Sequence, residues 1–181
     1  MTLSELVDAI SASTGLARGR VYMHARRLQE IGLAPVGQGG RNAPECDIGH
    51  VVLTLFALMS GLPVHHAAHA AVEFCELEND GAQALGYVTG MLESVAKVDK
   101  LDLTDVPEDL LLAFKSTIAF TSQPEPRMVV RYTCTDTPLE VAFTRDGVPY
   151  APENVEEITE SRSIPGTLLF RLGRAIRHVS K

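Results

Sequence analysis

The chain has 181 residues, of which 45% are hydrophobic and 22% are charged, and its formal net charge is −7. This length provides for one or two small domains with buried cores, and the composition argues against a disordered chain. The absence of Trp and the scarcity of other aromatic residues disfavour a stacking platform for single-stranded nucleic acid.

Charge is distributed unevenly along the sequence. Residues 16–42 contain five arginines and one acid, whereas residues 46–170 contain 7 basic and 19 acidic side chains. The last eleven residues, 171–181, again have an excess of four positive charges. Attraction to phosphate depends on the local field at the contact surface, so a basic segment on an acidic body remains able to bind a duplex.

Two short helices joined by a tight turn are predicted at the start of the chain. Residues 3–14 have an apolar stripe at helical spacing, with Thr2 or Ser4 as N-cap and Gly15 at the end. The second helix covers residues 17–31, and its apolar face consists of Val21, Ala25, Leu28 and Ile31. The opposite face has two neighbouring rows, Arg18, Tyr22 and Arg26, and Gly19, Met23 and Arg27.

Further elements follow in chain order. Gly32 ends the second helix, residues 33–36 are predicted as a short strand, and residues 37–42 as a Gly-rich loop or wing. Asp47 is expected to cap a buried helix over residues 48–60, which completes a three-helix core. Helices are then predicted over residues 64–77, 82–97 and 106–120.

The period of the apolar pattern changes near residue 127. Residues 127–134 and 139–145 are rich in β-branched side chains and predict an antiparallel hairpin. The acidic segment 151–163 has no assignment, and residues 164–179 predict a closing helix with Arg171, Arg174 and Arg177 outside. The expected fold is therefore α+β and mainly α, with a head of residues 1–61 and an oligomerisation or protein-interaction body of residues 62–181.

The N-terminal quarter resembles the winged helix-turn-helix heads of bacterial and phage regulators. The resemblance rests on Thr14-Gly15-Leu16, Val21, Arg26-Arg27-Leu28, Glu30 and Gly32-Leu33, and the general pattern is similar to proteins of phages and gene-transfer elements. It departs from that pattern because no full helix precedes Leu3, so helix 48–60 is expected to take the place of the usual first helix. The resemblance implies a helix that lies in the major groove of DNA and a wing beside it.

Candidate DNA-contacting residues follow from this arrangement. From the second helix they are Arg18, Arg20, Tyr22, Arg26 and Arg27, because arginine pairs bidentately with guanine and also binds phosphate. From the wing they are Gln38, Arg41 and Asn42, expected at the minor groove or at phosphates. Gly19 is expected where the start of the helix approaches the duplex. The Arg171, Arg174 and Arg177 face is a second DNA contact, a docking surface or a solvated helix face.

No metal, cofactor or catalytic group is expected. His65, His66 and His69 are interpreted as an incidental histidine surface, and the three scattered cysteines (Cys46, Cys75 and Cys134) as buried, reduced thiols. The sequence lacks the nucleophile-elbow, P-loop and zinc-protease motifs, which makes an enzyme an unfavoured hypothesis. With no long apolar run, the protein is expected to be cytoplasmic and without a membrane partner.

The leading hypothesis is a sequence-specific double-stranded DNA-binding transcription regulator of phage or mobile-element type, acting as a dimer. One alternative is a small-terminase-like DNA-packaging recognition subunit, which differs by forming a ring of many copies. Another is an adaptor whose acidic body binds a protein of the transcription machinery. The sequence does not distinguish activation from repression, nor does it define the operator.

Overall fold

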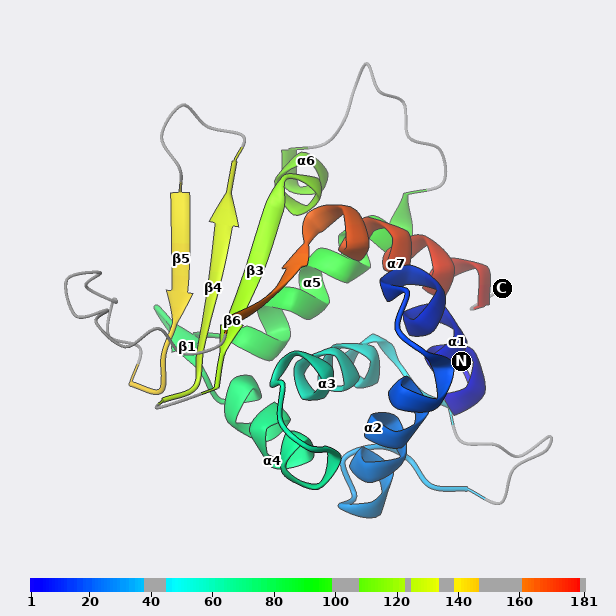
Figure 1. Ribbon diagram of the computed structural model, residues 1–181. Helices are drawn as coiled ribbons and strands as arrows, with labels where there is room; N and C mark the ends of the chain where they lie inside the picture. The colour runs from blue at the N-terminus through cyan, green and yellow to red at the C-terminus, as the bar shows by residue number, and fades with distance from the viewer. Residues whose placement is uncertain (38–44, 99–107, 123–124, 134–138, 147–160, 180–181) are drawn as a thin grey trace.

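The computed structural model describes residues 1–37, 45–98, 108–122, 125–133, 139–146 and 161–179, and has a mainly helical α+β fold. Figure 1 shows a group of helices on one side and a small antiparallel sheet on the other. Two of the segments outside this description, 38–44 and 147–160, include most of the predicted wing (37–42) and most of the unassigned acidic stretch (151–163), of which residues 161–163 are in a strand. No helix in the described ranges is long and apolar enough to cross a bilayer.

The three helices predicted for the head are present and have the expected ends. They are α1 (Leu3–Thr14), α2 (Arg18–Glu30) and α3 (Ile48–Met59). Thr2 caps α1 in a reciprocal box with Glu5, since each side chain accepts a hydrogen bond from the other residue's backbone N–H. Gly15 follows with a φ of 73°, which a glycine adopts without steric cost. Asp47 caps α3 by accepting the backbone N–H of His50, as predicted.

The next two helices pack around the head. They are α4 (Val64–Cys75) and α5 (Ala84–Lys97), and the short antiparallel strands β1 (Glu78–Asn79) and β2 (Ala82–Gln83) lie between them. Both α4 and α5 contact α3, and α4 also contacts α2. The helical group therefore continues without a break from the head into the body.

Four antiparallel strands form the main sheet in the order β5-β4-β3-β6. They are β3 (Ser116–Thr121), β4 (Arg127–Tyr132), β5 (Leu139–Phe143) and β6 (Ser161–Pro165). The pairing of β4 with β5 confirms the predicted hairpin. Strand β3, which the sequence did not predict, pairs with β4 on one side and with β6 on the other. Strand β6 forms one edge of the sheet.

Two predicted helix boundaries are wrong where the sheet begins and ends. The helix expected over 106–120 is α6 (Glu108–Phe114), and residues 116–121 are strand. Here burial alternates residue by residue, with Ser116, Ile118 and Phe120 buried, which is the period of a strand. The closing helix α7 (Gly166–Val179) begins after Pro165, because Ile164 pairs with Ile118 in the sheet.

In the described part of the chain the main hydrophobic core extends from the head helices into the sheet, and a small second cluster consists of Val95, Leu110 and Ala113. Helix α7 packs against α1, α5 and α6, so the C-terminal helix lies beside the first helix of the chain (Figure 1). Phe56 of α3, Phe74 of α4 and Phe120 of β3 meet edge to face, with ring centroids 5.4–6.0 Å apart. This core crosses the boundary predicted after residue 61, and independent folding of the two parts stays a prediction.

Candidate nucleic-acid interface

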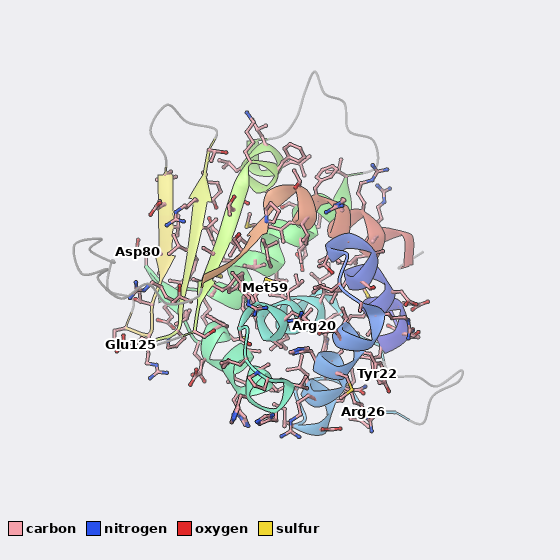
Figure 2. The ribbon with its side chains drawn as sticks, viewed as in Figure 1. Arg20, Tyr22, Arg26, Met59, Asp80 and Glu125 are labelled. Atoms are coloured by element: carbon pink, nitrogen blue, oxygen red, sulfur yellow. The ribbon has the colours of Figure 1, made fainter. Side chains whose placement is uncertain are left out.

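Helix α2 has one fully buried face and one exposed face. Val21, Ala25 and Leu28 are at most 1% exposed, as their apolar spacing predicted. On the other side, Tyr22 and Met23 are 41% and 54% exposed. Figure 2 shows Tyr22 and Arg26 along the outer side of α2. Five predicted DNA contacts therefore lie on one element, although each has different surroundings.

Arg18 is held by the neighbouring helix. Its Nε donates to Asp8 Oδ1 at 2.6 Å, and its Nη2 donates to Ser4 Oγ at 2.8 Å. The two charged side chains are 55% and 57% exposed. An ion pair this exposed contributes about 0–1 kcal/mol, so a phosphate group is able to replace Asp8 at small cost.

Glu30 neutralises part of the charge at the other end of α2. Its carboxylate lies 3.8 Å from Arg26 Nε and 3.1 Å from Arg27 Nη1. Arg26 remains exposed, whereas Arg27 is one third exposed and its Nε is buried without a hydrogen-bond partner. Arg26 is thus better placed than Arg27 to reach a ligand in solution.

Arg20 differs from the other three arginines. It is exposed and forms no ion pair with any residue that the structure describes. Figure 2 places it on the side of α2 toward Met59, away from Tyr22 and Arg26. Its neighbour His24 is 4% exposed, and burial, together with the charges of Arg20 and Arg162, lowers the pKa of His24.

The start of α2 is open to an approaching ligand. No side chain caps this helix, because the N-cap residue is Ala17. A helix N-terminus with free N–H groups attracts phosphate. A Cβ placed on Gly19 would meet no atom within 4 Å, so the glycine is not required by packing inside the protein.

The segment after α2 does not form the predicted strand. Gly32, with a φ of 80°, closes the helix, and the Leu33 N–H donates to Leu28 O while the Gly32 N–H donates to Gln29 O. This pattern is a Schellman motif. The Gln29 side-chain amide then donates to Pro35 O at 2.6 Å, which uses a carbonyl that a strand would need. Beyond this segment, the wing candidates Gln38, Arg41 and Asn42 lie outside the described residues.

The C-terminal arginines are divided between solvent and the protein. Arg171 and Arg174 are exposed on α7. Arg177 is half-buried and donates a hydrogen bond to the carbonyl of Val98 at the end of α5. This third arginine therefore fastens α7 to the body, an intramolecular role that its spacing alone did not indicate.

The histidines and cysteines form no metal site among the residues that the structure describes. His65, His66 and His69 are exposed on α4, and the first two rings lie 4.0 Å apart. Cys46 is buried, as expected, but Cys75 is only partly buried. Burial raises the pKa of Cys46, and burial with the charge of Glu76 raises the pKa of Cys75 to about 12, which keeps both as thiols. Cys134 lies outside the described residues.

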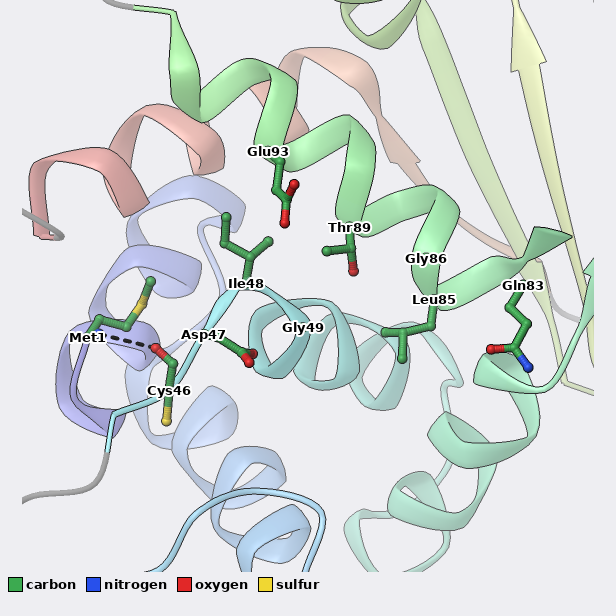
Figure 3. A pocket seen from close by; sticks show the side chains of 10 residues that line it. All are labelled: Met1, Cys46, Asp47, Ile48, Gly49, Gln83, Leu85, Gly86, Thr89 and Glu93. Carbon is green, nitrogen blue, oxygen red and sulfur yellow. Dashed lines mark hydrogen bonds between the residues drawn. The ribbon is translucent and has the colours of Figure 1, made fainter.

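An open pocket of about 620 Å³ lies between the start of α3 and helix α5 (Figure 3). Its two carboxylates come from Asp47 and Glu93, and Asp47 already caps α3. Thr89 Oγ1 is buried there without a hydrogen-bond partner. The Cys46 thiol and the Thr89 hydroxyl also line this pocket.

Sequence reasoning missed the partners of the arginines. Glu30 follows Arg26 and Arg27 by four and three residues on the same helix. Asp8 precedes Arg18 by ten residues and is on α1, so only the packing of α1 against α2 brings the two side chains together. Arg162 was not a candidate, because its position in an unassigned acidic stretch gave no sign that its charge affects His24 of α2. No family model, curated protein or solved structure matches this chain.

Proposed function

We propose that this protein binds double-stranded DNA through the exposed face of α2 and acts as a sequence-specific transcription regulator. The observation that carries the proposal is the contrast between the two sides of this helix. One side is anchored in the core by Val21, Ala25 and Leu28, while Arg18 and Arg26 are exposed on the other. A rigid helix with exposed guanidinium groups suits the major groove, where arginine recognises guanine O6 and N7.

Ion pairs within the protein fix the positions of the α2 arginines before DNA binds. Asp8 and Glu30 hold three guanidinium groups in place before DNA arrives. Each pair is at least one third exposed and costs little to exchange for a phosphate or a base edge. Binding then releases counterions from the duplex, which makes the affinity depend on salt.

The proposed regulator is a winged helix-turn-helix protein that works as a dimer. A single head contacts few base pairs, and two copies double the number of contacts. The acidic body then provides the surface for a second copy or for a protein of the transcription machinery. A body of like charge to DNA also restricts the orientation in which the head approaches the duplex.

A protein-binding adaptor is the second candidate, and one observation favours it. Three of the four arginines on α2 already have carboxylate partners, which weakens the positive field that DNA would meet.

A small-terminase-like packaging subunit would use the same helix in a ring of many copies. The stoichiometry in solution separates a ring from a dimer.

The test is selection of bound sequences from a random duplex library, followed by fluorescence anisotropy at several salt concentrations. Arg26→Gln should lower the affinity for the selected sequences, because it removes the bidentate donor to guanine. Arg26→Ala should also relax the sequence preference, whereas Arg41→Ala should weaken binding evenly across sequences. Arg145→Gln is the matched control, because Arg145 pairs with Glu73 on another element. Equal binding by the parent, Arg26→Gln and Arg26→Ala proteins would contradict the proposal.

A further inference from the structure

Arg162 points inward from an edge strand. In the sheet it pairs directly with Phe120, which is 1% exposed, and residues opposite each other in antiparallel strands project to the same face. The neighbouring pair on that face, Ile118 and Ile164, is also buried. The Arg162 side chain therefore extends toward the helical layer, and it forms no ion pair with any residue in the described ranges.

The guanidinium of Arg162 lies against the turn between α3 and α4. A Cβ on Gly61 would lie 2.7 Å from Arg162 Nε and 3.1 Å from Cζ, so a side chain at this position would force the guanidinium to move. Gly61 also has a φ of 74°, which favours glycine independently. The turn is further fixed because Ser122 donates to Ser60 O. These contacts place a half-buried positive charge at the junction between the sheet and the head.

Two more nitrogen groups come from α2, where Arg20 and His24 are about one helical turn apart and Arg20 lies on the side toward Met59 (Figure 2). His24 is 4% exposed, and its Nδ1 is buried without a hydrogen-bond partner. Buried polar atoms normally have a partner, and an absent water or ion is one explanation of such an orphan. The charged groups that affect His24 are Arg20 and Arg162, and no carboxylate is among them.

We propose that Arg20, His24 and Arg162 form a binding site for a phosphate group at the junction of α2, the α3–α4 turn and β6. Two guanidinium groups offer paired N–H donors to the phosphate oxygens, and the His24 Nδ1–H supplies another. A phosphate matches this site better than a carboxylate does, because it presents more acceptor oxygens and carries more negative charge. Arg20 is exposed, so the site opens to solvent on that side.

The site joins the proposed recognition helix to the body. A phosphate held by Arg20 and Arg162 connects α2 with β6, two elements far apart in the sequence. This inference goes beyond DNA binding by α2 and does not depend on it. The bound phosphate group belongs either to a small ligand or to the backbone of DNA, and the site recognises the same group in both cases.

Inorganic phosphate is the probe for the first experiment, with the full chain and with chloride used to keep the ionic strength constant. Calorimetry should detect saturable binding, and the NMR signals of the His24 imidazole should shift as phosphate is added. Arg162→Gln and Arg20→Gln should each weaken phosphate binding at least tenfold. Arg145→Gln makes the same charge change on an exposed arginine paired with Glu73, and it should alter binding less than twofold.

Several outcomes overturn the proposal. They are the absence of saturable phosphate binding to the parent, an Arg145→Gln effect as large as that of Arg162→Gln, and an unchanged His24 signal at saturation. Arg20 is exposed, so Arg20→Gln keeps the test valid if Arg162→Gln fails to fold. If the Arg162→Gln protein self-associates through β6 but binds phosphate as tightly as the parent, the role of Arg162 is to prevent the edge strand from pairing with another chain.

A duplex DNA arm identifies the source of the phosphate. If a bound duplex displaces inorganic phosphate and Arg162→Gln weakens duplex binding, the site takes a backbone phosphate. If phosphate and duplex bind together, or if only phosphate binds, the site takes a small phosphorylated ligand. Failure of the DNA-binding proposal alone therefore leaves phosphate binding intact, while failure of the phosphate site leaves duplex binding unaffected by Arg162→Gln.

Discussion

The guanidinium of Arg18 in α2 donates to the carboxylate of Asp8 in α1 at 2.6 Å and so ties the outer faces of two successive helices together. This bond fixes the direction of an arginine that would otherwise sample many rotamers. It also lowers the positive field of α2. The same carboxylate therefore prepares the arginine for a ligand and competes with that ligand.

Asp8→Asn should strengthen duplex binding. Removal of the carboxylate frees Arg18 and adds one unit of positive charge beside α2, so Kd should fall about two- to fivefold, the equivalent of an exposed ion pair of about 0.4–1 kcal/mol. Fluorescence anisotropy at low and moderate salt measures the change. Glu140→Gln is the matched control, since it frees Arg131 from an equally short pair on the sheet. A stronger effect from Glu140→Gln than from Asp8→Asn would contradict the role given to α2.

Gly19→Ala should separate stability from DNA binding. The new methyl group meets no atom within 4 Å, and alanine is favoured over glycine in a helix, so the free energy of unfolding should rise by up to about 1 kcal/mol. Duplex affinity should fall severalfold, because the Cβ intrudes where the start of α2 approaches the DNA. Urea denaturation and anisotropy on one preparation measure both quantities. Unchanged affinity would mean that this end of α2 does not approach the duplex.

His24 should make stability depend on pH. Burial and the charges of Arg20 and Arg162 lower its pKa in the folded protein from the ordinary 6.5. As pH falls through 6.5, the unfolded chain binds a proton at His24 and the folded protein does not. The free energy of unfolding therefore decreases from that pH down to the folded-state pKa, and then stays level.

The measurement is urea denaturation at several pH values between about 7.5 and 5, in the parent and in His24→Gln. The parent should lose more stability than the variant over this range, since the other histidines contribute equally to both proteins. Arg162→Gln should raise the pKa of His24 and so make the decrease in stability smaller. Identical pH profiles for all three proteins would show that His24 titrates as it does in the unfolded chain.

Gly166→Ala should destabilise the protein by about 1–3 kcal/mol or more through overpacking. A Cβ at this position would lie 2.1 Å from Ala113 O and 2.5 Å from Phe114 O, and backbone atoms cannot rotate away. Thermal or urea denaturation measures the change. Gly90→Ala in α5 is the matched control, because its Cβ meets nothing within 4 Å and should leave stability equal or higher. Equal stability of the two variants would mean that α7 does not begin against α6.

Much of the helical part was predictable from local pattern. The apolar spacing of Val21, Ala25 and Leu28 indicated which side of α2 is buried, and the capping residues Thr2 and Asp47 indicated where helices begin. These signals act over one or two helical turns, which is the range over which a sequence pattern is informative. The hairpin of β4 and β5 was predictable for the same reason.

The missed features depend on pairing between distant segments. Residues 116–121 became a strand because β4 and β6 lie on either side of them, and β6 follows much later in the chain. The candidate site also contains residues from distant segments that the sequence could not predict. Arginines on α2 were predictable, but the carboxylate of Asp8 reaches Arg18, and the charge of Arg162 affects His24, only through the packing of whole elements.

The packing of α7 on α1 has a consequence for protein engineering. Residues 1–61 transplanted onto a foreign scaffold would leave uncovered the side of α1 that α7 shields in the native chain. Such a chimera would need a substitute cover, or grafting of the last helix as well. The beginning and the end of this polypeptide must therefore be moved together.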